Sequence, residues 1–258
     1  MAAKKKSEQP TNHDYGPNPV NLTAAFSTKA IFPRFNVWIV GRTPLITHAW
    51  SEKARREMLG KQLKATKGGR EIRDPQAEFI SSLYDLGDGT YGFPATGVKK
   101  SFLSAAHKDK GIARVAVLSS LWIDAEMVRC RPALAGAVCD MPLVRIYSGA
   151  PEMREDIVKI GSGLNKVANL AYRGQFRFWA MNLKGRFSSA VLTPEAIAML
   201  IQESGSSDGL GEWRNSRGGV FGSFSLATET EEHAWNAFAR GAGPLPVPED
   251  YREDIAAE

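Results

Sequence analysis

Residues Gly92-Phe-Pro-Ala-Thr-Gly-Val-Lys-Lys-Ser-Phe-Leu-Ser-Ala-Ala106 hold the clearest helical pattern in the 258-residue chain. After Pro94, apolar side chains recur with the three-and-four spacing of one helix face, at Val98, Phe102, Leu103 and Ala106. Lys99 and Lys100 fall on the polar side of the same helix. The pattern therefore predicts an amphipathic helix over 95–107 that packs on a core and turns its lysines to solvent.

The segments on either side of this helix predict an α+β fold. Aromatic and β-branched residues alternate over Phe35–Val40, which indicates a strand that ends at Gly41. Further strands are expected over 91–93, 114–123, 143–147, 176–187 and 220–226, and further helices over 52–63, 75–84, 193–205 and 231–240. With two intervening segments set aside, the order is that of a ferredoxin-like (RRM-type) βαββαβ core. Such a core has both helices on one sheet face, and RNA-recognition domains bind RNA on the other.

Composition excludes several classes of protein. Hydrophobic residues make up 43% and charged residues 24%, so the chain is neither wholly disordered nor collagen-like. No apolar run approaches the roughly 20 residues of a membrane helix, and the basic start of the chain lacks the apolar stretch of a secretory signal. The two cysteines, Cys130 and Cys139, suit a reducing cytoplasm and predict neither a disulfide framework nor a zinc site.

Charge is distributed unevenly along the chain. The formal net charge is +5, but residues 1–70 carry a net +9 and residues 228–258 a net −6. A basic front and an acidic end favour a polyanionic partner. Solvated termini with no binding role would produce the same asymmetry, so both interpretations stay open.

The most distinctive loop is Gly209-Leu-Gly-Glu-Trp-Arg-Asn-Ser-Arg-Gly-Gly-Val-Phe-Gly222. Its glycines permit tight turns and close approach of the backbone to a ligand. Trp213 offers a stacking surface, and Arg214 and Arg217 offer contacts to phosphate. The loop follows a helix and enters a strand, unlike the glycine-rich turn of dinucleotide sites. We expect it to contact nucleic acid; a glycine-rich hairpin turn is the alternative.

Three segments together resemble the RAMP superfamily, the RNA-binding subunits of CRISPR effector complexes. They are Thr43-Pro-Leu-Ile, the segment Gly92–Ala106, and Leu210-Gly-Glu-Trp-Arg with Gly219-Val-Phe-Gly-Ser-Phe224, in the same order over 35–226. The resemblance implies a ferredoxin-type palm with a finger-like insert at about 48–90 and a thumb-like insert at about 148–174. It also implies self-association along a single strand. The sequence further resembles phage and prophage proteins of bacteria, which brings no activity with it.

We accordingly divide the chain into three parts. Residues 1–30 are expected to form a flexible basic arm, 31–227 a RAMP-like domain, and 228–258 a short helix with an acidic, Pro-rich tail. The tail could recruit a protein partner or compete with nucleic acid for the basic groove. These boundaries follow from composition and from the resemblance.

Evidence for catalysis is sparse. His48 is a weak candidate for a general base, since it would need a partner acid and a bound phosphodiester. The four histidines lack the spacing of metal ligands, and no phosphate-binding or nucleophile motif occurs. We expect no metal and no cofactor, and binding rather than catalysis. A RAMP-type endoribonuclease or nuclease, using His48 or a loop aspartate, is the first alternative, and a phage structural or interaction protein is the second.

The sequence thus predicts a cytoplasmic protein that binds single-stranded RNA or DNA, does not enter membranes, and forms a filament-like homo-oligomer. Electrostatic capture and aromatic stacking would hold the strand. The side chains expected to contact it are Arg42, Lys53, Arg55, Arg56, Lys99, Lys100, Arg154, Lys159, Arg173, Trp213, Arg214 and Arg217.

Overall fold

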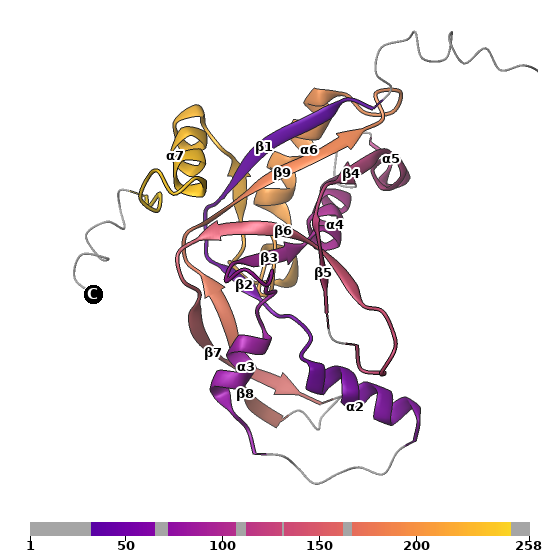
Figure 1. The fold of residues 1–258 in the computed structure, drawn as a ribbon. Coiled ribbons are helices and arrows are strands. Elements are labelled where there is room, and N and C mark those ends of the chain that lie inside the picture. Colours follow the sequence, from indigo (N-terminus) through magenta and orange to yellow (C-terminus); the bar gives the residue numbers. More distant parts are fainter. Residues whose placement is uncertain (1–31, 65–71, 107–111, 131, 162–166, 249–258) are drawn as a thin grey trace, which may run out of the picture. The chain divides into compact units, whose positions relative to one another are not determined.

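Strands β1 (Arg34–Gly41) and β9 (Trp179–Phe187) form the central antiparallel pair of the main sheet (Figure 1). The structure, a computed structural model, describes residues 32–64, 72–106, 112–130, 132–161 and 167–248. The predicted arm over 1–30 and the end of the acidic tail from 249 lie outside these residues. β10 (Phe224–Leu226) pairs with β1, and β4 (Leu121–Ile123) pairs with the end of β9. These four strands lie in the order β10-β1-β9-β4 and are all antiparallel to their neighbours.

Three more strands extend this sheet. β6 (Asp140–Ser148) pairs with the beginning of β9, while β3 (Tyr91–Pro94) and β5 (Glu126–Arg129) both pair with β6. The sheet thereby contains seven strands among the described residues. The strands predicted over 143–147 and 91–93 are confirmed as β6 and β3.

A long hairpin projects from the main sheet. β6 continues into β7 (Glu152–Ile160), and β8 (Val167–Phe176) continues into β9. The register is constant along the whole hairpin: Tyr147 pairs with Ala180, and Ile160 pairs with Val167. Beyond the main sheet, β8 pairs with β2 (Leu45–Thr47) to make a second sheet in the order β2-β8-β7. The segment 148–174, where the sequence shows no clear core pattern, thus holds β7 and most of β8.

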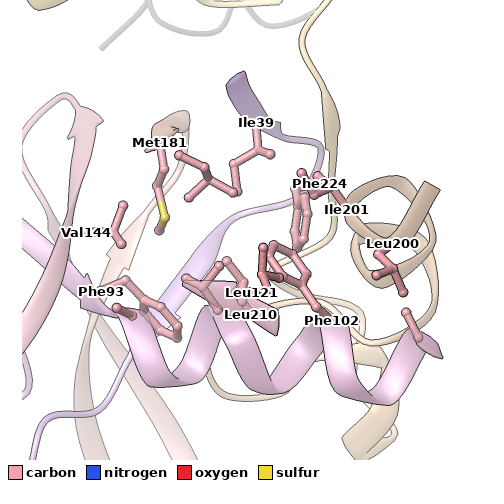
Figure 2. Packing of buried hydrophobic residues seen from close by; sticks show 14 of the residues in the cluster. Ile39, Phe93, Phe102, Leu121, Val144, Met181, Leu200, Ile201, Leu210 and Phe224 are labelled. Carbon is pink, nitrogen blue, oxygen red and sulfur yellow. The ribbon is translucent and has the colours of Figure 1, made fainter. Parts of the chain in front are cut away.

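Two helices cover one face of the main sheet. α4 (Ala95–Ala106) is the predicted amphipathic helix, and α6 (Pro194–Ser207) begins after Thr193, whose side chain accepts a hydrogen bond from the Ala196 amide at 3.2 Å. Figure 2 shows their buried side chains meeting those of the sheet. The cluster includes Ile39 and Met181 from the strands and Phe102, Leu200 and Ile201 from the helices.

The opposite face is partly covered by α7 (Glu229–Ala239), the C-terminal helix in yellow in Figure 1. Trp235 of α7 is buried with Trp38, Val40 and Ala180. The expectation that this face is open to a ligand, as in RNA-recognition domains, is therefore wrong over this part of the sheet. The physical reason is the apolar surface of Trp38 and Val40, which is stabilised by burial.

The structure corrects one predicted strand and shows two short helices. The segment 114–123 was expected to be a strand, but it forms the helix α5 (Arg114–Ser120) followed by the short strand β4. α2 (Glu52–Gln62) and α3 (Pro75–Ser81) begin at the predicted positions, after the caps Ser51 and Asp74. α3 ends before the predicted Tyr84. Among the described residues, every helix is too short or too polar to cross a membrane.

The cysteines also depart from expectation. Cys130 and Cys139 form a disulfide across the loop between β5 and β6. The Cys130 amide donates to the Cys139 carbonyl at 2.8 Å, which continues the ladder of the two strands up to the bridge. The prediction that these cysteines provide no disulfide framework is wrong, because strand pairing brings together two residues that are nine positions apart in the sequence.

Candidate nucleic-acid interface

The glycine-rich loop 209–222 is held against β2 by backbone hydrogen bonds. The Gly222 amide donates to the Pro44 carbonyl at 2.8 Å, and the Glu212 amide donates to the Ile46 carbonyl at 3.0 Å. A Cβ atom on Gly211, whose φ is +79°, would lie 2.3 Å from the Ile46 oxygen, so glycine is required for this approach. Two segments that the resemblance rests on, Thr43-Pro-Leu-Ile and the loop, are thus in direct contact.

Trp213 has a strained backbone within this loop. Its φ is +53°, in the left-handed region that a bulky L-residue adopts only where the surroundings impose it. Gly219 packs so closely that a Cβ atom there would lie 1.7 Å from the Trp213 carbonyl oxygen. Trp213 is nevertheless 38% exposed. The loop therefore holds a large aromatic side chain at the surface in a fixed, unfavourable backbone conformation.

The two loop arginines differ in their surroundings. Arg214 Nη1 donates to the Gly211 carbonyl at 3.0 Å, and its Nε lies 3.6 Å from the buried carboxylate of Asp208. These contacts use part of the Arg214 guanidinium to fold the loop. Arg217 lies exposed in the short 3-10 helix η1 (Asn215–Arg217). Of the two, Arg217 is the more available to a ligand.

His48 meets a carboxylate of the same loop. Its Nδ1 lies 2.5 Å from Oε1 of Glu212, and Tyr84 Oη donates to the His48 carbonyl at 3.2 Å. Burial raises the pKa of Glu212, but the hydrogen bond from His48 and the charges of His48 and Arg173 outweigh it, so this pKa lies below its ordinary value. Burial, and then the charge of Glu212, raise the pKa of Tyr84. The partner acid for His48 is therefore Glu212, which lies in the glycine-rich loop 209–222. The sequence alone did not identify it.

Arg154 and Arg173 lie on the hairpin side facing this loop. Arg173 is 7% exposed and forms ion pairs with Glu212 and, at 3.7 Å, with Asp156. The Arg154 guanidinium lies 4.5 Å from the centre of the Phe221 ring, and its Nε donates to Asp156 at 2.9 Å. Both arginines are compensated by carboxylates, and the burial of Arg173 leaves it little surface to offer a strand. They join the hairpin to the loop.

The remaining predicted cations are spread over other elements. The Arg42 guanidinium is bound by Glu231 of α7, and Arg56 lies 3.3 Å from Glu52 within α2. Arg55 Nη1 contacts Cys139 Sγ at 3.4 Å. Lys99 donates to the Leu118 carbonyl at 2.8 Å, and burial lowers its pKa. Exposed surface is retained by Lys53, Lys100 and Lys159.

The structure thus brings together His48, Arg154, Arg173, Trp213 and Arg214, and we call this region the loop junction. Arg42 is tied to α7, and Lys99 to α5, rather than to the junction. Sequence reasoning missed Glu212 as the partner of His48 and Phe221 as the partner of Arg154, because these partners lie on distant segments. In the part of the chain that the structure describes, no group of three His, Cys, Asp or Glu side chains is placed to hold a metal ion.

Comparisons with known proteins do not identify a family for this chain. No protein-family model matches the chain, and no curated protein matches it. Its function must therefore be argued from the loop junction and the rest of the described surface.

Proposed function

We propose that this protein binds single-stranded nucleic acid at the loop junction. The observation that supports this most is Trp213, an exposed aromatic residue with a strained backbone. It lies in sequence between Glu212, which contacts His48, and Arg214. Any of the bases can stack on an indole, so this contact does not require a particular nucleotide sequence. The exposed Arg217 can pair with phosphate. Backbone strain at Trp213 lowers the free energy of unfolding, and a role in binding would explain why this conformation is retained.

We further propose that the fold is ferredoxin-like and related to the RAMP superfamily. The strand order β10-β1-β9-β4, with α4 and α6 on one face, supports this proposal. The chain would self-associate along the bound strand. In its support, β7 pairs with β8 alone among the described residues, so its other edge has backbone groups that another copy could pair with.

The location and further partners belong to the same proposal. A cytoplasmic protein would encounter single-stranded RNA or DNA, and its disulfide would be subject to reduction there. The acidic tail would attract a protein partner or compete for the cationic surface. RNA is favoured by the RAMP resemblance, and DNA by a phage replication context.

The direct test is fluorescence anisotropy with a labelled unstructured oligonucleotide at two salt concentrations. We expect binding that weakens with salt. Trp213→Ala should cost roughly 1–3 kcal/mol of binding free energy, the range measured for base stacking on aromatic residues. Val220→Ala, which truncates an exposed apolar side chain in the same loop, is the matched control. A wild-type protein that leaves the anisotropy unchanged at low salt would contradict the proposal.

A second candidate function is RNA cleavage, favoured by the 2.5 Å contact between His48 and Glu212. Glu212 would orient the imidazole, which would take the proton of a ribose 2′-hydroxyl. The 2′-oxygen would then attack the adjacent phosphorus and expel the 5′-oxygen, which takes a proton from water. A 2′,3′-cyclic phosphate and a 5′-hydroxyl result, and the imidazolium gives its proton to the hydroxide that remains. RNA should be cut without metal, and His48→Ala should abolish cutting while binding persists. A strand with a 2′-deoxy residue at the cut position should stay intact; cleavage of that strand would exclude this mechanism.

A further inference from the structure

The part of the main sheet that α7 does not cover carries a compact group of cations. Across β1 and β9, Arg34 lies directly opposite Arg186, and Asn36 lies opposite Lys184. Across β9 and β4, Arg186 lies opposite Trp122. Arg34, Arg186 and Lys184 are all exposed. They share one sheet face with Trp38, because side chains alternate along a strand and each of these residues is in phase with it.

Two like charges directly opposite each other destabilise a sheet. The charge of one arginine is compensated by a carboxylate, since Arg34 Nη2 lies 2.6 Å from Asp124 Oδ2. The Arg186 guanidinium instead lies over the Trp122 indole, 5.6 Å from its centre. Lys184 adds a third positive charge in the next row. The group therefore keeps an excess of positive charge that an anion would neutralise.

The indole that Arg186 contacts packs against a second aromatic ring. Phe32 packs edge-on against Trp122, with ring centres 5.4 Å apart, and Phe32 is itself 50% exposed. A guanidinium in cation–π contact with an indole is planar, and where it is exposed, as in Arg186, it can offer a face of that plane to a further flat ring. Phosphate-binding cations and a stacking plane in one place match the two parts of a nucleotide.

We infer that this face, formed by Phe32, Arg34, Trp122, Lys184 and Arg186, is a second binding surface for single-stranded nucleic acid. A base stacks on the Arg186 guanidinium, and the neighbouring phosphates pair with Arg34 and Lys184. The inference rests on the proposed function for the class of ligand, but it uses a surface made of other residues. An acidic peptide would use the cations without needing the stacking plane, and the experiment separates the two.

The experiment compares substitutions at the two surfaces, using an unstructured oligonucleotide and the same strand with abasic sites. Arg34→Ala should weaken binding of both strands and reduce the slope of log affinity against log salt by about 0.7, the value for one phosphate contact on a single strand. Arg186→Lys keeps the charge but removes the plane. It should weaken binding of the intact strand about five-fold or more, as expected for a lost stacking contact, and leave the abasic strand unaffected. Arg240→Ala, which removes a cation at the end of α7, is the charge-matched control.

The outcomes distinguish this inference from the proposed loop site. If Arg34→Ala and Arg186→Lys bind like the wild type while Trp213→Ala binds weakly, the sheet surface is refuted and the loop junction stands. If only the sheet variants bind weakly, the loop junction is refuted and the sheet surface stands. The stacking role would be overturned if Arg186→Lys weakened binding of the intact and abasic strands equally. If polyglutamate of equal charge also displaced the oligonucleotide, the surface would be a site for acidic peptides. Circular dichroism melting checks that each variant is folded.

Discussion

Glu231 of α7 accepts hydrogen bonds from both terminal nitrogens of Arg42, at 2.5 and 3.0 Å. The two residues are 189 positions apart, and their contact ties the C-terminal helix to the end of β1. The same carboxylate accepts from the Thr228 amide at 2.9 Å, which completes a capping box at the start of α7. The hydrogen bond from Arg42 is the main reason that the pKa of Glu231 lies below its ordinary value.

Replacing this carboxylate should loosen α7. Glu231→Gln is expected to lower the free energy of unfolding at neutral pH by about 1 kcal/mol, because a cap and a partly exposed ion pair are weakened together. A carboxyl group with a lowered folded-state pKa stabilises the fold above its unfolded pKa, and this contribution is lost as the pH falls through the folded value. Urea unfolding between pH 7 and pH 3 should therefore show a smaller loss of stability on acidification in the variant. Glu232→Gln, on an exposed neighbour, should behave like the wild type.

Two glycines of the loop offer a matched pair of substitutions. Gly222 has a φ of +68°, and a Cβ atom there would lie 1.8 Å from the Leu210 carbonyl oxygen. Gly218 has a similar φ of +77° but nothing within 4 Å of its Cβ position. Gly222→Ala should thus lower the melting temperature much more than Gly218→Ala does. Gly218→Ala loses only about 1 kcal/mol of unfolding free energy, because its backbone conformation is unfavourable for alanine. Equal melting temperatures in a thermal scan would show that the close contact at Gly222 is absent in solution.

Reduction of the disulfide should destabilise the hairpin of β5 and β6. Loop-closure entropy for a bridge of this short separation predicts a loss of up to about 3 kcal/mol in the free energy of unfolding. Hydrogen exchange over 126–143, measured with and without dithiothreitol, should accelerate in the reduced protein. Amides in β1 should keep their protection, since β1 is not adjacent to β5. Unchanged exchange over 126–143 would mean that strand pairing alone holds this hairpin.

The open edge of β7 predicts how copies would associate. Ile157 on this strand is 73% exposed, and Ile157→Lys places a charge beside the edge. We expect the variant to bind a short oligonucleotide normally but to form smaller complexes on a long one in sedimentation velocity. Val115→Lys alters a similarly exposed side chain on α5, at 72%, and serves as the control. Complexes of wild-type size with Ile157→Lys would contradict association through this edge.

Local pattern was sufficient for the elements with strong periodicity or clear caps. The stripe at Val98 and Phe102 predicted α4, and Thr193 with Pro194 predicted the start of α6. The prediction from local pattern was wrong over 114–123, since the short apolar run Val115-Ala-Val-Leu118 is equally compatible with a strand and with a helical turn. Tertiary packing decides there: Val117 is buried while Val115 and Leu118 are exposed.

The candidate site was less accessible to sequence reasoning than the fold. A list of basic residues cannot show which of them meet a carboxylate, and Arg42 and Arg173 are both compensated by residues far along the chain. The pairing of Arg34 with Arg186 arises only from the register of β1 against β9. By contrast, Trp213 and Arg217 were predicted correctly to lie in a glycine-rich loop, because that loop is continuous in sequence.

The constant register of the hairpin from β6 to β9 has a consequence for protein engineering. All pairs from Tyr147–Ala180 to Ile160–Val167 follow from the register set in the main sheet. Residues added between Ile160 and Val167 extend the chain beyond the last pair and displace none of those below it. A fluorescent tag or a peptide epitope inserted there would report on the protein without altering the sheet, whereas a single residue added within β7 alone would turn every side chain beyond it to the opposite face.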